Sequence, residues 1–112
     1  RGTHGALSRF DRAHASIARV TNFRRGAVDD WPTGNRDHAP TILAILRIKP
    51  TSMDGRVLAE AMLSRPTVGK SRTETLEASR EFPSASWRQH LKISHVGQTI
   101  YFDEGNGALV PK

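Results

Sequence analysis

Five histidines are the side chains of this sequence best suited to metal binding or acid–base catalysis, because an imidazole ligates metals and titrates near neutral pH. They are His4, His14, His38, His90 and His95. No two of them show the His-x-x-x-His spacing that places two ligands on one face of a helix. His90 and His95 lie five positions apart in a predicted strand, so their side chains point to opposite faces. We therefore interpret the last four as ordinary surface histidines.

His4 differs from the other histidines in its neighbours. It stands in the run Gly2-Thr3-His4-Gly5, where two glycines allow the backbone to approach a ligand closely. A histidine in such a loop suits a metal ion or a phosphate group. Because a single ligand does not make a metal site, His4 needs further ligands from outside this loop.

Other kinds of catalytic chemistry find little support in the sequence. The 112 residues contain no cysteine, which excludes a disulfide framework, a cysteine-based zinc site and a thiol nucleophile. Ser8, Ser71 and Ser94 lack the G-x-S-x-G surroundings of an activated serine. No apolar run approaches the roughly 18 residues that a membrane-spanning helix needs. From the residues alone we thus predict a domain of mixed helices and strands, with His4 as the one candidate metal ligand.

The net charge of +6 is concentrated in the first half of the chain. Residues 1–50 carry nine basic and four acidic side chains, whereas residues 51–112 carry eight and seven. Such a surface attracts nucleic acid, phosphate esters or anionic lipid. The arginines are scattered, however, and no aromatic side chains alternate with them as stacking platforms, so we do not expect nucleic acid as the main partner. A small, basic, non-catalytic module that binds nucleic acid or another polyanion is the alternative function.

The elements that must position these residues fall into three stretches. Residues 1–35 are rich in turns, with a short strand predicted at 15–20. Asp37 is predicted to cap a helix that Lys49 and Pro50 terminate, and residues 56–63 form a second amphipathic helix. Residues 66–72 are interpreted as a linker.

The remainder of the chain alternates between apolar and polar residues, as strands do. Residues 73–107 are predicted to form a three-stranded antiparallel β meander, followed by a tail at 108–112. Gly97 and Gln98 form a two-residue turn, in which glycine takes the position that needs a positive φ. This register places Ile93 opposite Phe102, so the apolar faces of the two strands coincide.

Several segments, taken in order, resemble the alkaline phosphatase superfamily, and in particular its phosphodiesterase, nucleotide pyrophosphatase and sulfatase-like branches. Gly2-Thr3-His4-Gly5 resembles the late G-T-H-G loop of that superfamily. The D-x-A-P-T-I-L helix is matched by Asp37, Ala39, Pro40, Thr41, Ile42 and Leu43, after Thr33-Gly34-Asn35. The M-D-G-R-x-L segment is matched by Met53-Asp54-Gly55-Arg56-Val57-Leu58. The C-terminal hairpin of one subgroup is matched by Trp87-Arg88-Gln89 and Tyr101-Phe102-Asp103-Glu104-Gly105-Asn106. Arg47 stands where a glycine is common in the family.

The resemblance implies an α/β fold, with this chain as the C-terminal fragment of an alkaline-phosphatase-like sheet-and-helix domain ending in an antiparallel β meander. Residues 1–65 would close the catalytic domain, and its two helices would pack as scaffold against a sheet. His4 would bind one ion of a divalent metal centre, most often two zinc ions, that acts on a small-molecule phosphate ester. The superfamily's nucleophile and most of its ligands precede this loop, so the chain alone is expected to be inactive. Its start at Arg1, without an initiator methionine, fits a piece of a longer protein. Family members are frequently periplasmic or secreted.

Overall fold

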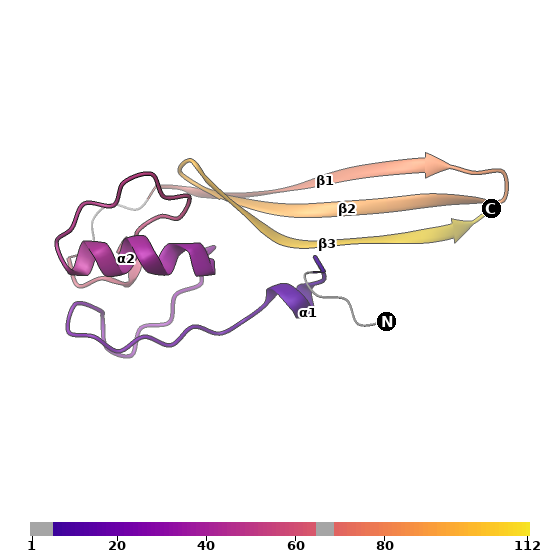
Figure 1. Cartoon of the computed structure of the whole chain (residues 1–112). Helices are drawn as coiled ribbons and strands as arrows, with labels where there is room; N and C mark the ends of the chain where they lie inside the picture. Colours follow the sequence, from indigo (N-terminus) through magenta and orange to yellow (C-terminus); the bar gives the residue numbers. More distant parts are fainter. Residues whose placement is uncertain (1–5, 65–68) are drawn as a thin grey trace. The chain divides into compact units, whose positions relative to one another are not determined.

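The computed structural model describes residues 6–64 and 69–112, which form two compact units (Figure 1). The first, here called the sheet unit, comprises the N-terminal segment to Ala15 together with Arg72–Ser94 and Phe102–Lys112. The second, called the helix unit, comprises Ser16–Ser71 and His95–Tyr101. Among the described residues, no helix is long and apolar enough to cross a membrane.

The predicted three-stranded antiparallel meander is confirmed. Strands β1 (Ser71–Glu81), β2 (Ala85–Val96) and β3 (Thr99–Pro111) lie in the order β1-β2-β3. Gly97 has a φ of 58°, as the predicted turn between β2 and β3 requires. The strands are longer than predicted, since β1 begins within the expected linker and β3 extends through most of the expected tail. The sequence therefore located the sheet and its second turn but not its full extent.

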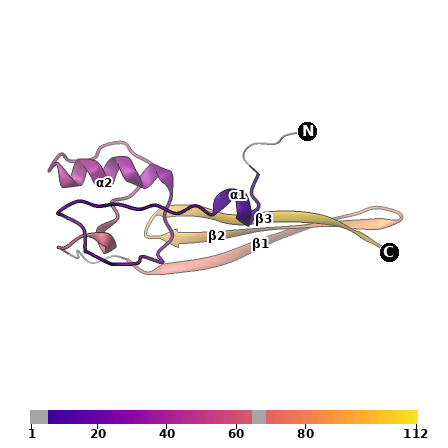
Figure 2. The same cartoon turned by 90° about the horizontal axis from the view of Figure 1, so that it is seen from below.

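The edge of β3 is partly covered by the N-terminal segment that carries the one-turn helix α1 (Arg9–Arg12), as Figure 2 shows. The Leu7 carbonyl accepts a hydrogen bond from the Gly105 amide at 2.6 Å. The Arg12 guanidinium donates two hydrogen bonds, of 3.1 and 2.9 Å, to the Phe102 carbonyl. These contacts satisfy edge groups of β3 that another chain would otherwise be able to pair with.

The helix unit departs most from the prediction. Helix α2 (His38–Ile45) is present but ends before Lys49 and Pro50, and the predicted strand at 15–20 has no regular secondary structure. Ile17 in that segment is 96% exposed. The weak alternation of apolar and polar residues along 15–20 therefore corresponds to no buried face of a strand. Within residues 6–64 and 69–112, the helical part of the predicted α/β fold consists of the two-turn helix α2, the single turn of α1 and two short 3₁₀ turns, Asn35–Asp37 and Ala59–Ala61.

The predicted helix at residues 56–63 is wrong. Only the 3₁₀ turn Ala59–Ala61 forms there, because the backbone groups of this segment bind elsewhere. The Ala61 carbonyl accepts from the Arg24 amide at 3.0 Å, and the Leu63 amide donates to the Asn22 carbonyl at 2.9 Å. These two bonds flank an antiparallel bridge between Phe23 and Met62. A continuous α-helix would need the same groups for its own i to i−4 bonds.

Helix α2 ends in a left-handed residue that is not glycine. Arg47 has a φ of 60°, and its amide donates to the Ala44 carbonyl at 3.0 Å. The Ile48 amide donates to the Leu43 carbonyl at 2.8 Å, which completes a Schellman motif. This position normally favours glycine, because a Cβ atom disfavours the left-handed conformation.

Replacing Arg47 by glycine is therefore expected to raise the free energy of unfolding by about 0.5–1 kcal/mol. Glycine removes the conformational strain of the folded state, and this gain exceeds the cost of the conformational entropy that glycine adds to the unfolded state. Urea unfolding followed by circular dichroism measures the change. Arg25→Gly is the matched control, because Arg25 is also exposed but is not among the residues with a positive φ. It should be neutral or destabilising. Equal effects of the two substitutions would contradict this account of the α2 terminus.

Candidate functional site

His4, the predicted metal ligand, lies outside the described residues. His14, His38 and His90 each make a contact with a different residue. The His14 Nδ1 atom lies 3.1 Å from the Arg12 carbonyl oxygen, and the His38 Nε2 atom lies 3.2 Å from the Ser16 hydroxyl. His90 lies 4.0 Å from a Glu104 carboxylate oxygen. Within residues 6–64 and 69–112, no group of three or more His, Asp or Glu side chains is placed to hold a metal ion. The described part of the chain therefore does not by itself form the implied metal centre.

The structure instead brings together a buried polar cluster in the helix unit, which we call the Asp37 cluster and define as Gly34, Asp37, Thr41, Arg56, Glu60 and Tyr101. Asp37 is fully buried at its centre. Its carboxylate accepts hydrogen bonds from the Gly34 amide at 2.8 Å, the Arg56 amide at 2.9 Å and the Tyr101 hydroxyl at 2.9 Å. Three donors compensate for the loss of water around the buried carboxylate.

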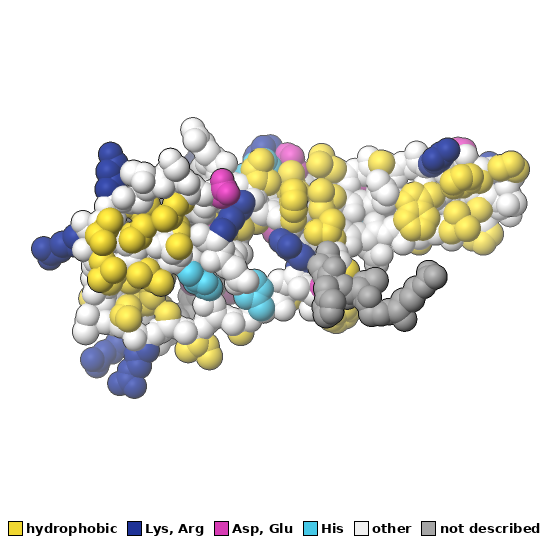
Figure 3. All heavy atoms as spheres, in the orientation of Figure 1, with side chains coloured by type: hydrophobic (Ala, Val, Ile, Leu, Met, Phe, Trp, Pro, Cys, Tyr) yellow, Lys and Arg dark blue, Asp and Glu magenta, His cyan; other side chains and the backbone are white. Residues whose placement is uncertain are grey.

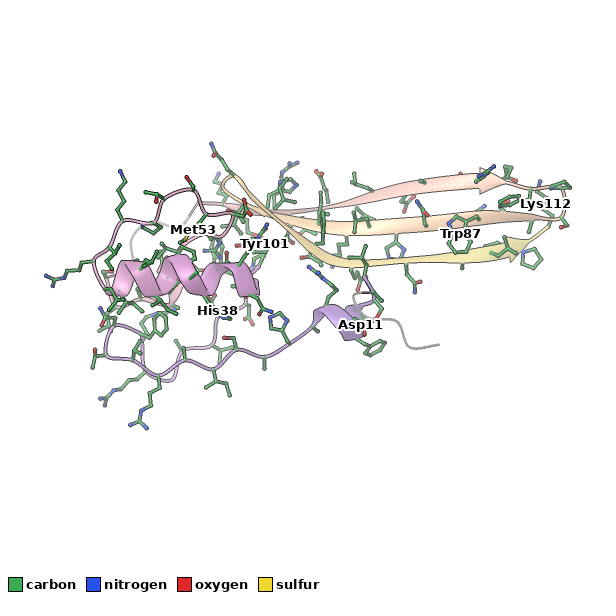
Figure 4. The ribbon with its side chains drawn as sticks, in the orientation of Figure 1. Asp11, His38, Met53, Trp87, Tyr101 and Lys112 are labelled. Atoms are coloured by element: carbon green, nitrogen blue, oxygen red, sulfur yellow. The ribbon has the colours of Figure 1, made fainter. Side chains whose placement is uncertain are left out.

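Tyr101 connects the tip of the β2–β3 hairpin to this carboxylate, and Figure 4 shows it beside the end of α2 that carries His38. Its hydroxyl donates to Asp37 and accepts from the Arg56 Nε atom at 2.9 Å. Burial and the hydrogen bond to Asp37 raise the pKa of Tyr101 to about 12. The phenol thus remains protonated at neutral pH and serves as a donor rather than as a base.

Arg56 uses its whole guanidinium within the unit. Its two Nη atoms bind the Glu60 carboxylate at 2.8 and 2.5 Å, and Nη2 also donates to the Pro32 carbonyl at 2.9 Å. Burial works against the charged guanidinium, but the hydrogen bonds and the charge of Glu60 outweigh it and raise the pKa of Arg56. The bidentate geometry makes this a strong and orientation-specific pair.

Two further contacts lock residues 37–41 against residues 55–58. The Thr41 hydroxyl donates to the Asp37 carbonyl at 2.6 Å and accepts from the Leu58 amide at 3.0 Å. Gly55 packs directly on the Arg36 backbone, where a Cβ atom would lie 2.5 Å from the carbonyl carbon and closer still to the oxygen. The two segments are therefore joined through both side chains and backbone.

The prediction that Asp37 acts as the N-cap of the helix needs correction. Its side chain makes no capping hydrogen bond to α2, and its backbone is already helical. The carboxylate instead reaches back to the Gly34 amide and across to Arg56 and Tyr101. Sequence reasoning also gave no role to Tyr101. The available signal in the sequence was its position three residues after the Gly97-Gln98 turn.

The Asp37 cluster has the properties of a structural network that stabilises the fold, not of a catalytic site. Asp37 has no solvent-exposed surface, and its partners Tyr101 and Arg56 also bind one another. No group in it presents a free nucleophile or base to a substrate. Arg24 and Arg36 both donate to backbone carbonyls within the helix unit, so these two of the basic side chains of residues 1–50 make hydrogen bonds inside the protein.

These features define a class of structure rather than a chemistry. One unit is an antiparallel three-stranded sheet, and the other is a small helical unit whose own segments are held together by a buried carboxylate. Comparisons with protein-family profiles, with curated proteins and with solved structures give no match.

Proposed function

We propose that this chain is the C-terminal part of a metal-dependent phosphoric ester hydrolase similar to the phosphodiesterases and nucleotide pyrophosphatases of the alkaline phosphatase superfamily. In this proposal His4 supplies one metal ligand, and the Asp37 cluster is scaffold. The nucleophile and the remaining ligands belong to residues that precede His4, so the 112-residue chain alone is not an active hydrolase.

One observation carries the proposal: two of the segments that create the resemblance, residues 37–43 and 53–58, contact one another. Asp37 and Thr41 of the first motif bind the backbone amides of Arg56 and Leu58 in the second. Gly55 of the second motif packs on the backbone that precedes Asp37. A chance match would have no reason to select buried, interacting positions. The pairing therefore supports reading the two motifs as one inherited unit.

The role of each residue follows from its chemistry. A neutral imidazole of His4, in the run Gly2-Thr3-His4-Gly5, would donate a lone pair to a divalent ion, and its other ring nitrogen would need an acceptor to fix the tautomer. Such an ion, when bound, polarises a phosphoryl oxygen. Asp37, Thr41 and Gly55 would fix the backbone on which the C-terminal end of the catalytic domain is built.

The test begins with the DNA upstream of the codon for Arg1. An open frame with a threonine or serine nucleophile among aspartate ligands is expected. In the longer protein, His4→Ala should lower the hydrolysis of bis(p-nitrophenyl) phosphate at least a hundredfold, because loss of one ligand weakens the metal and the polarisation of the ester. Zinc content by mass spectrometry should fall in parallel.

His14→Ala is the matched control, because His14 is an exposed histidine that binds only a neighbouring carbonyl. It should leave both activity and zinc content unchanged. Full activity and stoichiometric zinc in His4→Ala would overturn the assignment of His4. A start codon directly upstream of Arg1 would overturn the hydrolase proposal itself.

A further inference from the structure

The segment that follows α2 exposes apolar and basic side chains alternately. We call residues 46–49 the α2 tip; it consists of Leu46, Arg47, Ile48 and Lys49. Leu46 is 60% exposed and Ile48 is 53% exposed, and both basic residues are exposed as well. Ile42, four residues before Leu46 on the same face of α2, is 55% exposed. Figure 3 shows hydrophobic side chains gathered over this helix, with Lys and Arg side chains at the margin.

The electrostatics of the tip are uniformly positive. No acidic residue occurs anywhere between His38 and Met53 in the sequence. Neither Arg47 nor Lys49 forms a salt bridge within the part of the chain that the structure describes. An anionic surface therefore meets two cations at this tip without competition from a local carboxylate.

The backbone conformation of Arg47 is a second, independent indication that the positive charge of this side chain has a function. The φ of 60° favours glycine, yet an arginine occupies the position. Residues held in sparsely populated backbone conformations are concentrated at functional sites. Here the turn directs one basic side chain out between two exposed apolar ones.

We propose that the α2 tip binds the surface of a membrane rich in anionic phospholipid, with Leu46 and Ile48 entering the headgroup boundary and Arg47 and Lys49 binding the phosphates. The alternation of basic and apolar side chains favours a membrane as the partner. Leu46 and Ile48 are exposed beside the exposed cations Arg47 and Lys49, and no acidic residue occurs between His38 and Met53. Interfacial membrane binding combines inserted apolar side chains with basic residues near the anionic surface, each worth about 1 kcal/mol. The proposal does not rest on the hydrolase function.

The experiment measures partitioning of the chain onto vesicles of phosphatidylcholine and onto vesicles with about one-third phosphatidylserine, by sedimentation. Binding is expected only to the second kind, and it should weaken with salt. Arg47→Gly should lower the partition coefficient about fivefold, which corresponds to the loss of one basic residue at the surface. Arg47→Gly with Lys49→Gln should lower it about 25-fold, and Leu46→Gln about tenfold.

Arg47→Gly is informative because glycine suits the left-handed position, so weaker binding of this variant cannot be attributed to unfolding. Val28→Ser is the matched control, since Val28 is 85% exposed in the same unit but outside the tip, and it should bind like the parent chain. No binding to anionic vesicles would overturn the proposal. Binding that Arg47→Gly and Leu46→Gln leave unchanged would also overturn it.

Discussion

Gly55→Ala is expected to lower the free energy of unfolding of the helix unit by about 3 kcal/mol or more. The added Cβ would lie 2.5 Å from the Arg36 carbonyl carbon and 3.0 Å from the Asp37 amide nitrogen. These are backbone atoms, so no side-chain rotation relieves the overlap, and one of the two segments must move. Overpacking of this kind typically costs 1–3 kcal/mol, about the upper end when the backbone itself is displaced. Movement of Asp37 would in addition stretch its hydrogen bonds to Arg56 and Tyr101.

The measurement uses a Trp87→Phe background, which leaves Trp31 in the helix unit as the only tryptophan. Urea unfolding followed by Trp31 fluorescence then reports on that unit. Gly26→Ala is the matched control: Gly26 has a φ of 63°, but nothing lies within 4 Å of an added Cβ. Its cost should therefore stay near 1 kcal/mol, the conformational cost alone. If Gly55→Ala were no more destabilising than Gly26→Ala, the close approach of the two segments would be contradicted.

The meander was predictable because its signals are local. Alternation along each strand fixes which side chains share a face, and a glycine in the turn fixes where the chain reverses. Gly97 with its positive φ is a direct consequence of that turn type. The strand ends were less predictable. Strand β1 begins at Ser71 and strand β3 ends at Pro111. These ends depend on the neighbouring strand rather than on the residue types of Ser71 and Pro111.

The helix unit was harder to predict because nonlocal bonds decide its backbone. Residues 56–63 have an amphipathic helical pattern, but the Arg56 amide binds Asp37 and the Leu58 amide binds Thr41. These partners lie 19 and 17 residues away, so no local window contains them. Tertiary hydrogen bonds thus override helix propensity, which contributes only a few tenths of a kcal/mol per residue.

The same reasoning explains what was missed at the candidate site. Asp before a helix is the ordinary N-cap pattern, and sequence alone gives no sign that this carboxylate is buried. Tyr101 reaches Asp37 across 64 residues, through the tip of a hairpin. Asp37, Thr41, Gly55 and Arg56 all belong to the segments that resemble the family's motifs, but the resemblance gave no sign of the contacts among them. Their roles become apparent only from the contacts between the motifs.

Asp37→Ala is expected to destabilise the helix unit by about 4 kcal/mol. The substitution leaves the Gly34 amide, the Arg56 amide and the Tyr101 hydroxyl without their acceptor in a site closed to solvent. Each buried donor left unsatisfied costs about 1–3 kcal/mol. A loss of this size approaches the total stability of a small domain, about 5–15 kcal/mol. Trp31 fluorescence in the Trp87→Phe background measures the loss, and Asp30→Ala, at an exposed neighbouring acid, should change stability by less than about 0.5 kcal/mol.

The partner variants decide whether Asp37 acts through the contacts described or only through its volume. Asp37→Asn keeps the size of the side chain but replaces one acceptor with a donor, so it should still cost about 2 kcal/mol. Tyr101→Phe removes the phenol that bridges Asp37 and Arg56. Because the two side chains share a hydrogen bond, the double variant Asp37→Asn with Tyr101→Phe should be less destabilising than the sum of the single ones, by about 1 kcal/mol. If the changes in the free energy of unfolding were strictly additive, the two residues would not interact. The Asp37 cluster would then not be the hydrogen-bond network that joins the hairpin tip to α2.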